Sequence, residues 1–539
     1  MPTTADVLAL TLRAAGVTRM FGLPGGEVLD FIEAARRAGI SFLLTRHEAT
    51  ASLMADVTGQ LTRRPGVAVA TLGPGAVNMT LGVANAYLDR SPVIAITGSH
   101  ALAAAPLATH QNLDLNAVYR PFTKVAITLD GHDTERKVRR AIGASLAPRM
   151  GPVHIALPSD VARAAEHVSD DPDREIGVSE PLEAGDDEVA SVAAEIAAAR
   201  RPVVILGLDL DPIADRDPVR KFVEALEVPV FVTPKAKGLL PEDHPLFYGV
   251  CAGVAGDAAV VRFLGRADLL LGIGFDPVES DKLWHHTMKL VSVGPVSIAA
   301  GAFEPHVEAV GPVRGTLNAL RDRCGGPFGW STADRERFRD DLLSLLRPAV
   351  RPRALSGYEL TCRLRELFPR DAICTTDVGS VKMIVTQAWQ TFDPLTFLES
   401  NGLSTMSYAF PAAMAARLQF PDRPVLCTIG DGGFGMVLAD LETCVREQIP
   451  FVTVVYNDAS LSLIDVAQQR RGYPTIGVRH GDVDFARVAA AFGAWGRRVR
   501  TLAELDAAVL EARRVERPAV IDAIVDPAEY LAQNVPELR

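Results

Sequence analysis

The stretch PVLCTIGDGGFGMVLADLETCVREQIPFVTVVYND, residues 424–458, decides the fold. Two short apolar runs, VLCTI and FVTVVYN, lie on either side of a segment of helical length. A buried strand, a helix and a second buried strand in this order form a βαβ unit with parallel strands. The same alternation recurs in GVAVATLGPG, SPVIAITG, RPVVILGL and ADLLLGIG. The predicted fold class is therefore α/β, with buried parallel sheets.

The length of the chain predicts several domains. Its 539 residues are three to four times the usual domain size of about 150 residues. Two polar stretches, residues 165–187 and 325–356, are typical of linkers, so we predict domains at 1–165, 186–330 and 352–539. A strand, a glycine-rich loop, a helix and a strand follow each other in both outer domains, which indicates a weak internal repeat. The central domain has no dense cluster of polar residues, which favours a scaffold role.

Charge and cysteine content exclude some functions. The chain has 55 Lys and Arg residues against 66 Asp and Glu residues, a net charge of −11, and the basic residues are scattered, which argues against a nucleic-acid partner. No apolar run reaches the ~18 residues of a membrane span, and the first residues lack a basic leader and cleavage site. We therefore expect a cytoplasmic protein with no membrane partner. Six cysteines lie far apart without a CxxC pair and are predicted to be buried thiols.

The glycine-rich loop at residues 430–435 has two possible functions. It fits the pattern G-x-G-x-x-G that binds dinucleotides when it joins a strand to a helix. Its second residue, Asp431, would however repel a pyrophosphate unless a cation lay between them. A nicotinamide-dependent oxidoreductase leaves Asp431 unexplained, whereas a metal-bridged diphosphate accounts for it.

Asn457 supplies a second ligand for such a cation. Between Gly432 and Asn457 lie 24 residues, enough for one helix and a return strand. If the two strands are parallel neighbours, their ends lie about 5 Å apart at the edge where α/β proteins bind ligands. Asp431, Asn457, the Ala459 carbonyl and two diphosphate oxygens would suit Mg²⁺, and a helix after Gly433 would add N–H donors. The alternative is a tight turn at Asp431 and a strand-end cap at Asn457.

Motifs along the whole chain resemble one family. They are FGLPGG (21–26), TRHEATAS (45–52), TLGPGAVN (71–78), HQNLD (110–114), RPFTK (120–124), KGLLPEDHPLFYG (237–249), TTDVGS (375–380) and NGLSTMSYAFPAA (401–413). Together with GDG and the later Asn-Asp pair, they resemble the acetolactate synthase-like family of thiamine diphosphate enzymes. Benzoylformate decarboxylase, sulfoacetaldehyde acetyltransferase and 2-hydroxyacyl-CoA lyase belong to the same family. The resemblance implies thiamine diphosphate and Mg²⁺ as cofactors, bound by a pyrimidine-binding, a central Rossmann-like and a diphosphate-binding domain.

Glu48 is the main catalytic candidate. It follows the apolar run ISFLLT and precedes a segment of small residues, which is compatible with a buried helix start. By resemblance, Glu48 binds the pyrimidine ring of the cofactor, where a carboxyl group in a dry place can share its proton. The alternative is a surface glutamate paired with Arg46 or His47.

The resemblance also implies further cofactor contacts. Met406 would wedge the cofactor into a bent shape, and the Ser404 carbonyl would accept its amino group. Since the pyrimidine and diphosphate ends bind different domains, usually of different subunits, it implies a homodimer or homotetramer with the active site between subunits. The cofactor-binding residues predicted in this way are Leu23, Pro24, Glu48, Pro74, Asn78, Val378, Gly379, Ser404, Met406, Gly430, Asp431, Gly432, Gly433 and Asn457.

The chain departs from authentic acetolactate synthases at several positions. Val381-Lys382 replaces His-Gln, Ala467 replaces a tryptophan, and Glu27 stands where alanine is usual. The segment Gly274–Pro277 lacks the arginines of the flavin-binding segment, which makes bound FAD doubtful. Substrate selection or proton transfer is therefore expected from His110, Gln111, Glu27 and Lys382, although each could be a polar rim residue.

These observations predict an enzyme for 2-oxo acids. By resemblance, it removes CO₂ from a 2-oxo acid and transfers the resulting enamine to an acceptor carbonyl, as acetolactate synthase does. A decarboxylase without ligation and a 2-hydroxyacyl-CoA lyase are alternatives, the lyase being disfavoured by the short segment after IDAIVD. A nicotinamide-dependent oxidoreductase and a catalytically silent regulatory homologue remain from other classes.

Overall fold

A computed structural model of the protein describes residues 1–167, 175–179, 181–251, 253–279, 289–299, 304–347 and 353–533. Both predicted linkers, and the first and last residues of the predicted domain 352–539, fall partly outside the described residues. The described chain forms two compact units. One comprises Met1–Glu180, Gly402–Pro421 and Val437–Ile449, and the other Pro181–Asn401, Asp422–Met436 and Pro450–Arg539. The predicted domain boundaries stay predictions.

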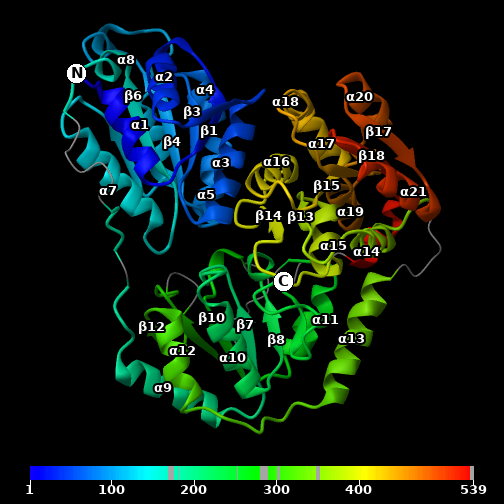
Figure 1. Ribbon diagram of the computed structural model, residues 1–539. Helices are drawn as coiled ribbons and strands as arrows, with labels where there is room; N and C mark the ends of the chain where they lie inside the picture. The colour runs from blue at the N-terminus through cyan, green and yellow to red at the C-terminus, as the bar shows by residue number, and fades with distance from the viewer. Residues whose placement is uncertain are drawn as a thin grey trace. The chain divides into compact units, whose positions relative to one another are not determined.

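Three six-stranded parallel sheets confirm the α/β class; Figure 1 shows them in blue to cyan, green, and yellow to red. The first sheet has the order β2-β1-β3-β4-β6-β5. Its strands are β1 (Arg19–Leu23), β2 (Ser41–Leu44), β3 (Gly66–Ala70), β4 (Val93–Ser99), β5 (Val125–Thr128) and β6 (Val153–Pro158). One face packs on α1 (Thr4–Ala14), α2 (Leu29–Arg37) and α7 (Thr134–Leu146), and the other on α3 (Glu48–Thr62) and α5 (Thr80–Leu88). Short helices α4 (Pro74–Asn78), α6 (Leu115–Tyr119) and α8 (Ser159–Ala162) follow strands of this sheet.

The central sheet has the order β12-β11-β10-β7-β8-β9. Its strands are β7 (Pro202–Leu206), β8 (Val230–Val232), β9 (Phe247–Val250), β10 (Leu269–Ile273), β11 (Leu290–Gly294) and β12 (Val307–Val310). Read from β9, this is the strand order 3-2-1-4-5-6 of dinucleotide-binding folds, which confirms the Rossmann-like prediction. Its helices are α9 (Asp186–Ala198), α10 (Arg216–Leu226) and α12 (Val313–Arg321) on one face, and α11 (Asp257–Leu264) and α13 (Thr332–Leu346) on the other.

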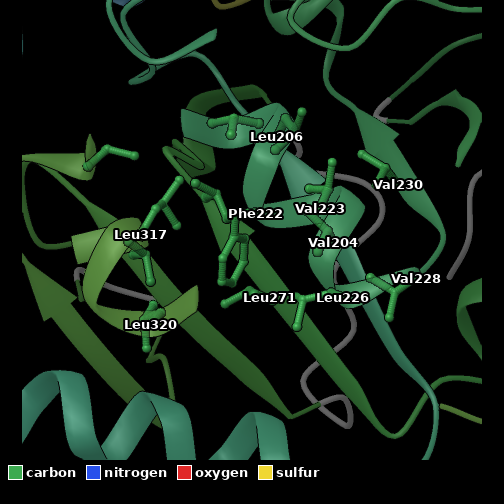
Figure 2. Close-up of a cluster of buried hydrophobic side chains, with 14 of the residues drawn as sticks. Val204, Leu206, Phe222, Val223, Leu226, Val228, Val230, Leu271, Leu317 and Leu320 are labelled. Carbon is green, nitrogen blue, oxygen red and sulfur yellow. The ribbon is translucent and has the colours of Figure 1, made fainter. Parts of the chain in front are cut away.

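Apolar periodicity builds the core of the central sheet. Phe222, Val223 and Leu226 of α10 come from one helical stripe, and Leu317 and Leu320 of α12 from another. Figure 2 shows these side chains gathered over strands β7 and β10. All are almost fully buried, and each buried side chain of this size contributes about 1.5–3 kcal/mol. The sheet is thereby fixed as a rigid base for the loops at its carboxyl edge.

The third sheet has the order β14-β13-β15-β16-β18-β17. Its strands are β13 (Ile373–Thr376), β14 (Phe397–Glu399), β15 (Val425–Gly430), β16 (Val452–Asn457), β17 (Trp495–Val499) and β18 (Ala519–Ile524). Helices α14 (Gly357–Leu367), α15 (Ser380–Ala388) and α21 (Leu502–Ala512) share its buried core. The remaining helices are α16 (Ala409–Gln419), α17 (Asp431–Val437), α18 (Asp440–Arg446), α19 (Ser462–Arg470), α20 (Phe485–Ala491) and α22 (Tyr530–Gln533).

The two outer sheets have the same topology, which confirms the predicted internal repeat. In each sheet, the strand that comes second along the chain lies on one side of the strand that comes first, and the strand that comes third lies on its other side. The direction of winding therefore reverses between β1 and β3, and between β13 and β15. Ligands of open α/β sheets bind at such switch points, outside the carboxyl ends of the strands.

One helix differs from the sequence prediction. The segment after Gly433 was predicted as one helix, but the structure has α17 from Asp431 and a separate α18. At the start of α17, the Asp431 carboxylate accepts the N–H of the adjacent Gly432 at 2.7 Å.

The cysteines and the helices agree with the compositional predictions. All six cysteines are unpaired, five are buried and Cys362 is half-buried. In the described part of the chain, the helices do not combine the length and the apolar character that crossing a membrane requires.

Candidate functional site

Glu48 lies at the carboxyl edge of the first sheet. It is the first residue of α3, and only 4% of its surface is exposed. Asn78 Nδ2 donates a hydrogen bond to Glu48 Oε2 at 3.1 Å. A Cβ atom on Gly75 would lie 2.9 Å from Glu48 Oε1, so this loop approaches the carboxyl group closely. The structure therefore brings Glu48 and Asn78 together and places α4, which ends at Asn78, against the Glu48 carboxyl group.

A buried polar stack holds α4 and was missed from the sequence. The Tyr119 hydroxyl donates to the Ala76 carbonyl at 2.5 Å, and the Tyr119 ring stacks on His154 at 4.1 Å between ring centres. His154 contacts Thr97 and Asn116, and burial lowers its pKa to about 3, so the ring is neutral. The ring thus packs as a neutral hydrogen-bonding group. No motif marks these residues, because each contact joins distant segments.

The start of α3 is held by a second unpredicted residue, Asp440 of α18. Its carboxylate accepts the Arg46 N–H at 2.7 Å and the Thr50 hydroxyl at 2.6 Å. Burial raises the pKa of Asp440, and these hydrogen bonds oppose the rise. Asp440 thereby fixes the turn of chain from which Glu48 projects.

Two predicted cofactor contacts, Leu23 and Pro24, and the substrate candidates of the first sheet lie nearer the surface. Leu23 ends β1, Pro24 follows it, and Glu27 Oε2 accepts the Thr71 hydroxyl at 2.5 Å. Gln111 packs on Gly73, where an added Cβ would lie 2.9 Å from the Gln111 Cβ. The His110 carbonyl contacts His100 Nε2 at 2.8 Å. The side chains of His110 and Gln111 are exposed.

Ser404 and Met406 precede α16, which packs on α3. The Gly402 N–H donates to Asp89 at 2.8 Å and fixes the start of this segment. Ser404 is exposed and Met406 is half-buried. Ser404 has a φ angle of +54°, a left-handed conformation that costs a residue other than glycine about 1–2 kcal/mol. Gln111 and Ala459 share this feature, with φ angles of +53° and +55°. Such strain concentrates at functional sites.

The predicted metal ligands meet at the carboxyl edge of the third sheet. Strands β15 and β16 are parallel neighbours, with Gly430 opposite Tyr456, as the sequence predicted. The Ala459 N–H donates to Asp431 Oδ2 at 2.6 Å and lies 3.3 Å from Asn457 Oδ1. The Ala459 carbonyl accepts the His480 N–H at 3.1 Å, which leaves one lone pair for a cation.

Asn457 is oriented by Asp522, which the sequence did not single out. Its Nδ2 donates to Asp522 Oδ1 at 2.9 Å and to the Val483 carbonyl at 3.1 Å. Asp522 is fully buried and accepts the Arg498 guanidinium at 2.8 Å. Because the amide nitrogen is held by acceptors, the amide oxygen faces Ala459. This is the orientation that cation binding requires.

Two carboxyl groups share this edge. Burial raises the pKa of Asp431, against the effect of the His480 charge and of backbone N–H donors. The Asp458 carboxylate accepts the Ser460 N–H at 3.0 Å and the Ser462 hydroxyl at 2.7 Å. Burial, followed by the charge of Asp431, raises the pKa of Asp458 to about 7. A cation would stabilise both charges.

The same edge fits a diphosphate. A Cβ atom on Gly379, where φ is +107°, or on Gly430 would meet nothing within 4 Å, so both glycines face open space. Gly433 cannot be replaced, because a Cβ would lie 1.9 Å from Asp377 Oδ2. The hydroxyls of Thr376 and Ser380 are buried without a hydrogen-bond partner in the described structure. Open glycines and unused donors are what phosphate oxygens need.

In the described residues, three or more His, Cys, Asp or Glu side chains do not gather as a metal cluster. A cation at Asp431 would therefore depend on amide, backbone and phosphate oxygens.

Lys382, a substrate candidate from the sequence, is turned inward. Its ammonium group donates to the Ser400 carbonyl at 2.8 Å and to Asn401 Oδ1 at 2.9 Å, and it pairs with Glu399 at 3.4 Å. Its charge is thus compensated within the protein. Ala467 lies in α19. Val378 follows Asp377 in the loop between β13 and α15.

The carboxyl edge of the central sheet carries a buried carboxyl group of its own. Glu279 accepts the Leu208 N–H after β7 at 2.9 Å, the Thr233 hydroxyl after β8 at 2.7 Å and the Lys235 N–H at 3.2 Å. Leu208 and Glu279 follow β7 and β10, the two strands at the switch point of this sheet. The carboxyl group therefore accepts hydrogen bonds from N–H and O–H groups that would otherwise be available to an anionic ligand.

Three sequence families match the chain. They are "Thiamine pyrophosphate enzyme, N-terminal TPP binding domain" over residues 2–118, the central domain of the same enzymes over 189–320, and their C-terminal TPP binding domain over 377–523. These matches define the class: the chain is a thiamine pyrophosphate (thiamine diphosphate) enzyme with all three domains. They favour a thiamine cofactor over the nicotinamide alternative.

Full-length relatives narrow the class. The chain is 30% identical over 540 residues to acetolactate synthase of Bacillus subtilis, covering 98% of this chain and 94% of the relative. It is 30% identical over 522 residues, 94% and 90% of the two chains, to "Probable 2-ketoarginine decarboxylase AruI" of Pseudomonas aeruginosa. It is 29% identical over 562 residues, 96% and 94%, to 2-hydroxyacyl-CoA lyase of Oryza sativa. The chain belongs to the acetolactate synthase-like family of these enzymes, which confirms the resemblance seen in its motifs.

Proposed function

We propose that this protein removes CO₂ from a 2-oxo acid and joins the remaining acyl carbon to an acceptor carbonyl. With uptake of one proton, the product is a 2-hydroxy ketone or a hydroxy acid. The observation that carries the proposal is that one chain carries two separate half-sites. One is the buried carboxyl group of Glu48, and the other is the Asp431–Asn457 pair beside open glycines.

The third sheet would hold the diphosphate and Mg²⁺. Asp431 and the oriented amide of Asn457 supply two oxygen ligands, and Ala459 supplies a backbone oxygen. Val378, Gly379 and the Ser380 hydroxyl, with Gly430, Gly432 and Gly433, would surround the phosphate oxygens. The burial of Asp431 favours a bound cation.

The first sheet would hold the pyrimidine ring. Glu48 would hydrogen-bond that ring through its carboxyl group, and Asn78 fixes the orientation of the carboxyl group. Leu23, Pro24 and Pro74 would line the ring, Met406 would set the shape of the bound cofactor, and the Ser404 carbonyl would accept its amino group. When bound, thiamine diphosphate supplies the nucleophilic carbon and the electron sink for decarboxylation.

Two features of this proposal concern the assembly. We propose a homodimer or homotetramer, in which the Glu48 site of one chain and the Asp431 site of another complete one active site. We also propose that the chain works without FAD, because Glu279 already occupies donors at the central switch point.

A decarboxylase without ligation is the second candidate. It is supported by the relative whose printed name is a decarboxylase, which is as similar to this chain as the synthase. The reaction of 2-hydroxyacyl-CoA lyase stands behind it, supported by the rice relative.

A product screen tests these candidates. The enzyme is incubated with thiamine diphosphate, Mg²⁺ and pyruvate or aromatic and branched 2-oxo acids, with and without acceptor aldehydes and 2-oxo acids. We expect CO₂ release and a mass-spectrometric signal for the joined product. CO₂ and free aldehyde alone would support the decarboxylase, and no turnover of any acid would support a silent homologue.

A further inference from the structure

A cavity of about 520 Å³ lies within the unit that contains the central and third sheets. Its walls come from β9 and α13 beside the central sheet, and from α14 and α15 beside the third sheet. Sites for small molecules usually have volumes of about 300–1,000 Å³. The lining residues differ from those assigned to the cofactor and the metal, so a ligand in this cavity would occupy a second site.

Part of the lining is apolar and aromatic. Its members of this kind are Phe247, Tyr248, Leu342, Leu343, Leu346 and Tyr358. Burial raises the pKa of Tyr358 to about 12 and also raises the pKa of the Cys362 thiol, so both groups stay neutral at neutral pH. The cavity therefore offers a surface that fits the hydrophobic body of a ligand.

Three carboxylates and one arginine of the lining already have partners. The ion pairs are Glu242 with Lys237 at 2.5 Å, Asp243 with Arg370 at 2.7 Å and Glu366 with Arg363 at 2.5 Å. Arg365 donates to the Phe368 carbonyl at 2.9 Å, and its guanidinium lies 4.4 Å from the centre of the Trp389 ring. The carboxylates of the lining are therefore compensated by cations of the protein itself.

Two other arginines bring uncompensated positive charge to the cavity. Arg335 and Arg339 of α13 are four residues apart, so their side chains lie on one face of the helix. Arg335 donates to the His244 carbonyl over a long 3.4 Å. In the described chain, Arg335 forms no ion pair and Arg339 forms neither a hydrogen bond nor an ion pair. Like charges at this spacing repel each other, and a bound anion would remove the repulsion.

We propose that this cavity binds an organic anion in which a carboxylate or phosphate group is joined to an apolar body. The guanidinium groups of Arg335 and Arg339 bind the anionic group, because their paired N–H donors match two oxygens of either kind. The aromatic and leucine side chains cover the apolar body. The inference goes beyond the proposed function, since it concerns a ligand other than the cofactor and the reacting 2-oxo acid.

Calorimetric titration with four probes tests the proposal. The full-length protein, with thiamine diphosphate and Mg²⁺ present, is titrated with 4-phenylbutyrate, phenyl phosphate, 4-phenylbutan-1-ol and inorganic phosphate. We expect one of the two aromatic anions to bind at least about tenfold more tightly than the alcohol and than inorganic phosphate. The tighter of the two shows whether a carboxylate or a phosphate is preferred. Binding of the alcohol as tightly as the anions, or of none of the probes, would overturn the proposal.

Arginine variants locate the binding. Arg339→Gln should weaken binding of the preferred anion about fivefold, and its combination with Arg335→Gln about 20-fold. The matched control is Arg314→Gln, which removes an exposed arginine of α12 and should bind the anion as the wild type does. Equal affinities of the double variant and the wild type would contradict the assignment.

Alkylation of Cys362 provides a readout in the unaltered protein. Cys362 lines the cavity and is half-buried, whereas the other five cysteines are buried. Iodoacetamide should therefore modify Cys362 first, as mass spectrometry of its peptide would show. A saturating concentration of the preferred anion should slow this modification several-fold, and the alcohol at the same concentration should slow it less. An unchanged rate in the presence of the bound anion would place the anion elsewhere and reject the proposal.

Discussion

The carboxyl edges of the outer sheets differ from that of the central sheet, although all three are six-stranded and parallel. At the third sheet, Gly379 and Gly430 face open space and Ser380 keeps an unused hydroxyl. At the central sheet, the Glu279 carboxyl group accepts the Leu208 N–H and the Thr233 hydroxyl. The strand order of the central sheet is the one that binds dinucleotides, yet an acidic side chain takes the donors there. Topology marks where a ligand can bind, and the side chains decide whether it does.

The largest expected effect comes from Glu48→Gln at the first outer edge. Glutamine keeps the shape but cannot hold or share the proton, so we expect CO₂ release to fall by about 10²–10⁴-fold. Thiamine diphosphate should still bind within about threefold of wild type by isothermal titration calorimetry, because the diphosphate residues are unchanged. Glu33→Gln is the control for loss of a carboxylate, and wild-type turnover in Glu48→Gln would remove Glu48 from the mechanism.

Asp431→Asn should weaken cofactor binding at the carboxyl edge of the third sheet. The variant loses an ionised ligand for the cation, so we expect the affinity for thiamine diphosphate with Mg²⁺ to fall about 100-fold, or about 2.7 kcal/mol. The matched control is Asp422→Asn, which changes an exposed residue before the other end of the same strand. Equal affinities of wild type and Asp431→Asn would leave Asp431 as a helix cap only.

At the central edge, the expected effect is on stability and not on turnover. Burial raises the pKa of Glu279 to about 8 from its ordinary 4.5, against hydrogen bonds from Thr233 and Lys235. Between these pH values the folded chain keeps a proton that the unfolded chain releases. The stabilisation is therefore complete below pH 4.5 and is lost as the pH rises through 8, by at most about 1.4 kcal/mol per pH unit.

Glu279→Gln does not titrate and separates this contribution from the others. Urea unfolding of both proteins between pH 6 and 8 should show the wild type losing free energy of unfolding relative to the variant. Glu33→Gln, a surface change on α2 whose carboxylate pairs with Arg36 and Arg37, should show no such trend. A pH-independent difference for Glu279→Gln would contradict the assignment.

The smallest expected effect concerns the support of the first-sheet edge. Tyr119→Phe removes the hydrogen bond to Ala76 and loosens α4, the short helix that carries Asn78. We expect kcat to fall about fivefold, consistent with the ~1 kcal/mol of one buried hydrogen bond, with a far smaller change in cofactor affinity. Tyr87→Phe on α5 is the control, and equal kcat values of Tyr119→Phe and wild type would show that the loop is held by other contacts.

Much of the fold and of the candidate site could be predicted from local sequence. Apolar runs bounded by glycine and proline gave the strands, and the spacing of Asp431 and Asn457 placed both at one sheet edge, because the return strand lies beside the first. Glu48 was correctly predicted as a buried helix start.

The supporting residues could not be predicted, because their contacts are distant in sequence. Asp440 reaches Thr50 across 390 positions and Asp522 reaches Asn457 across 65, and neither aspartate lies in a motif. Glu279 gave no signal either, since its donors are backbone groups of two other loops and one threonine. The division of this segment into α17 and α18 is also not revealed by spacing.

Calorimetric titration of the purified protein tests the central claim most directly. Thiamine diphosphate is titrated with Mg²⁺ and with EDTA, and FAD and NAD are titrated separately. We predict binding of thiamine diphosphate that depends on Mg²⁺ and is weakened about 100-fold in Asp431→Asn, with no binding of FAD or NAD. Binding of FAD or NAD alone, or of thiamine diphosphate with equal affinity in EDTA, would contradict the account.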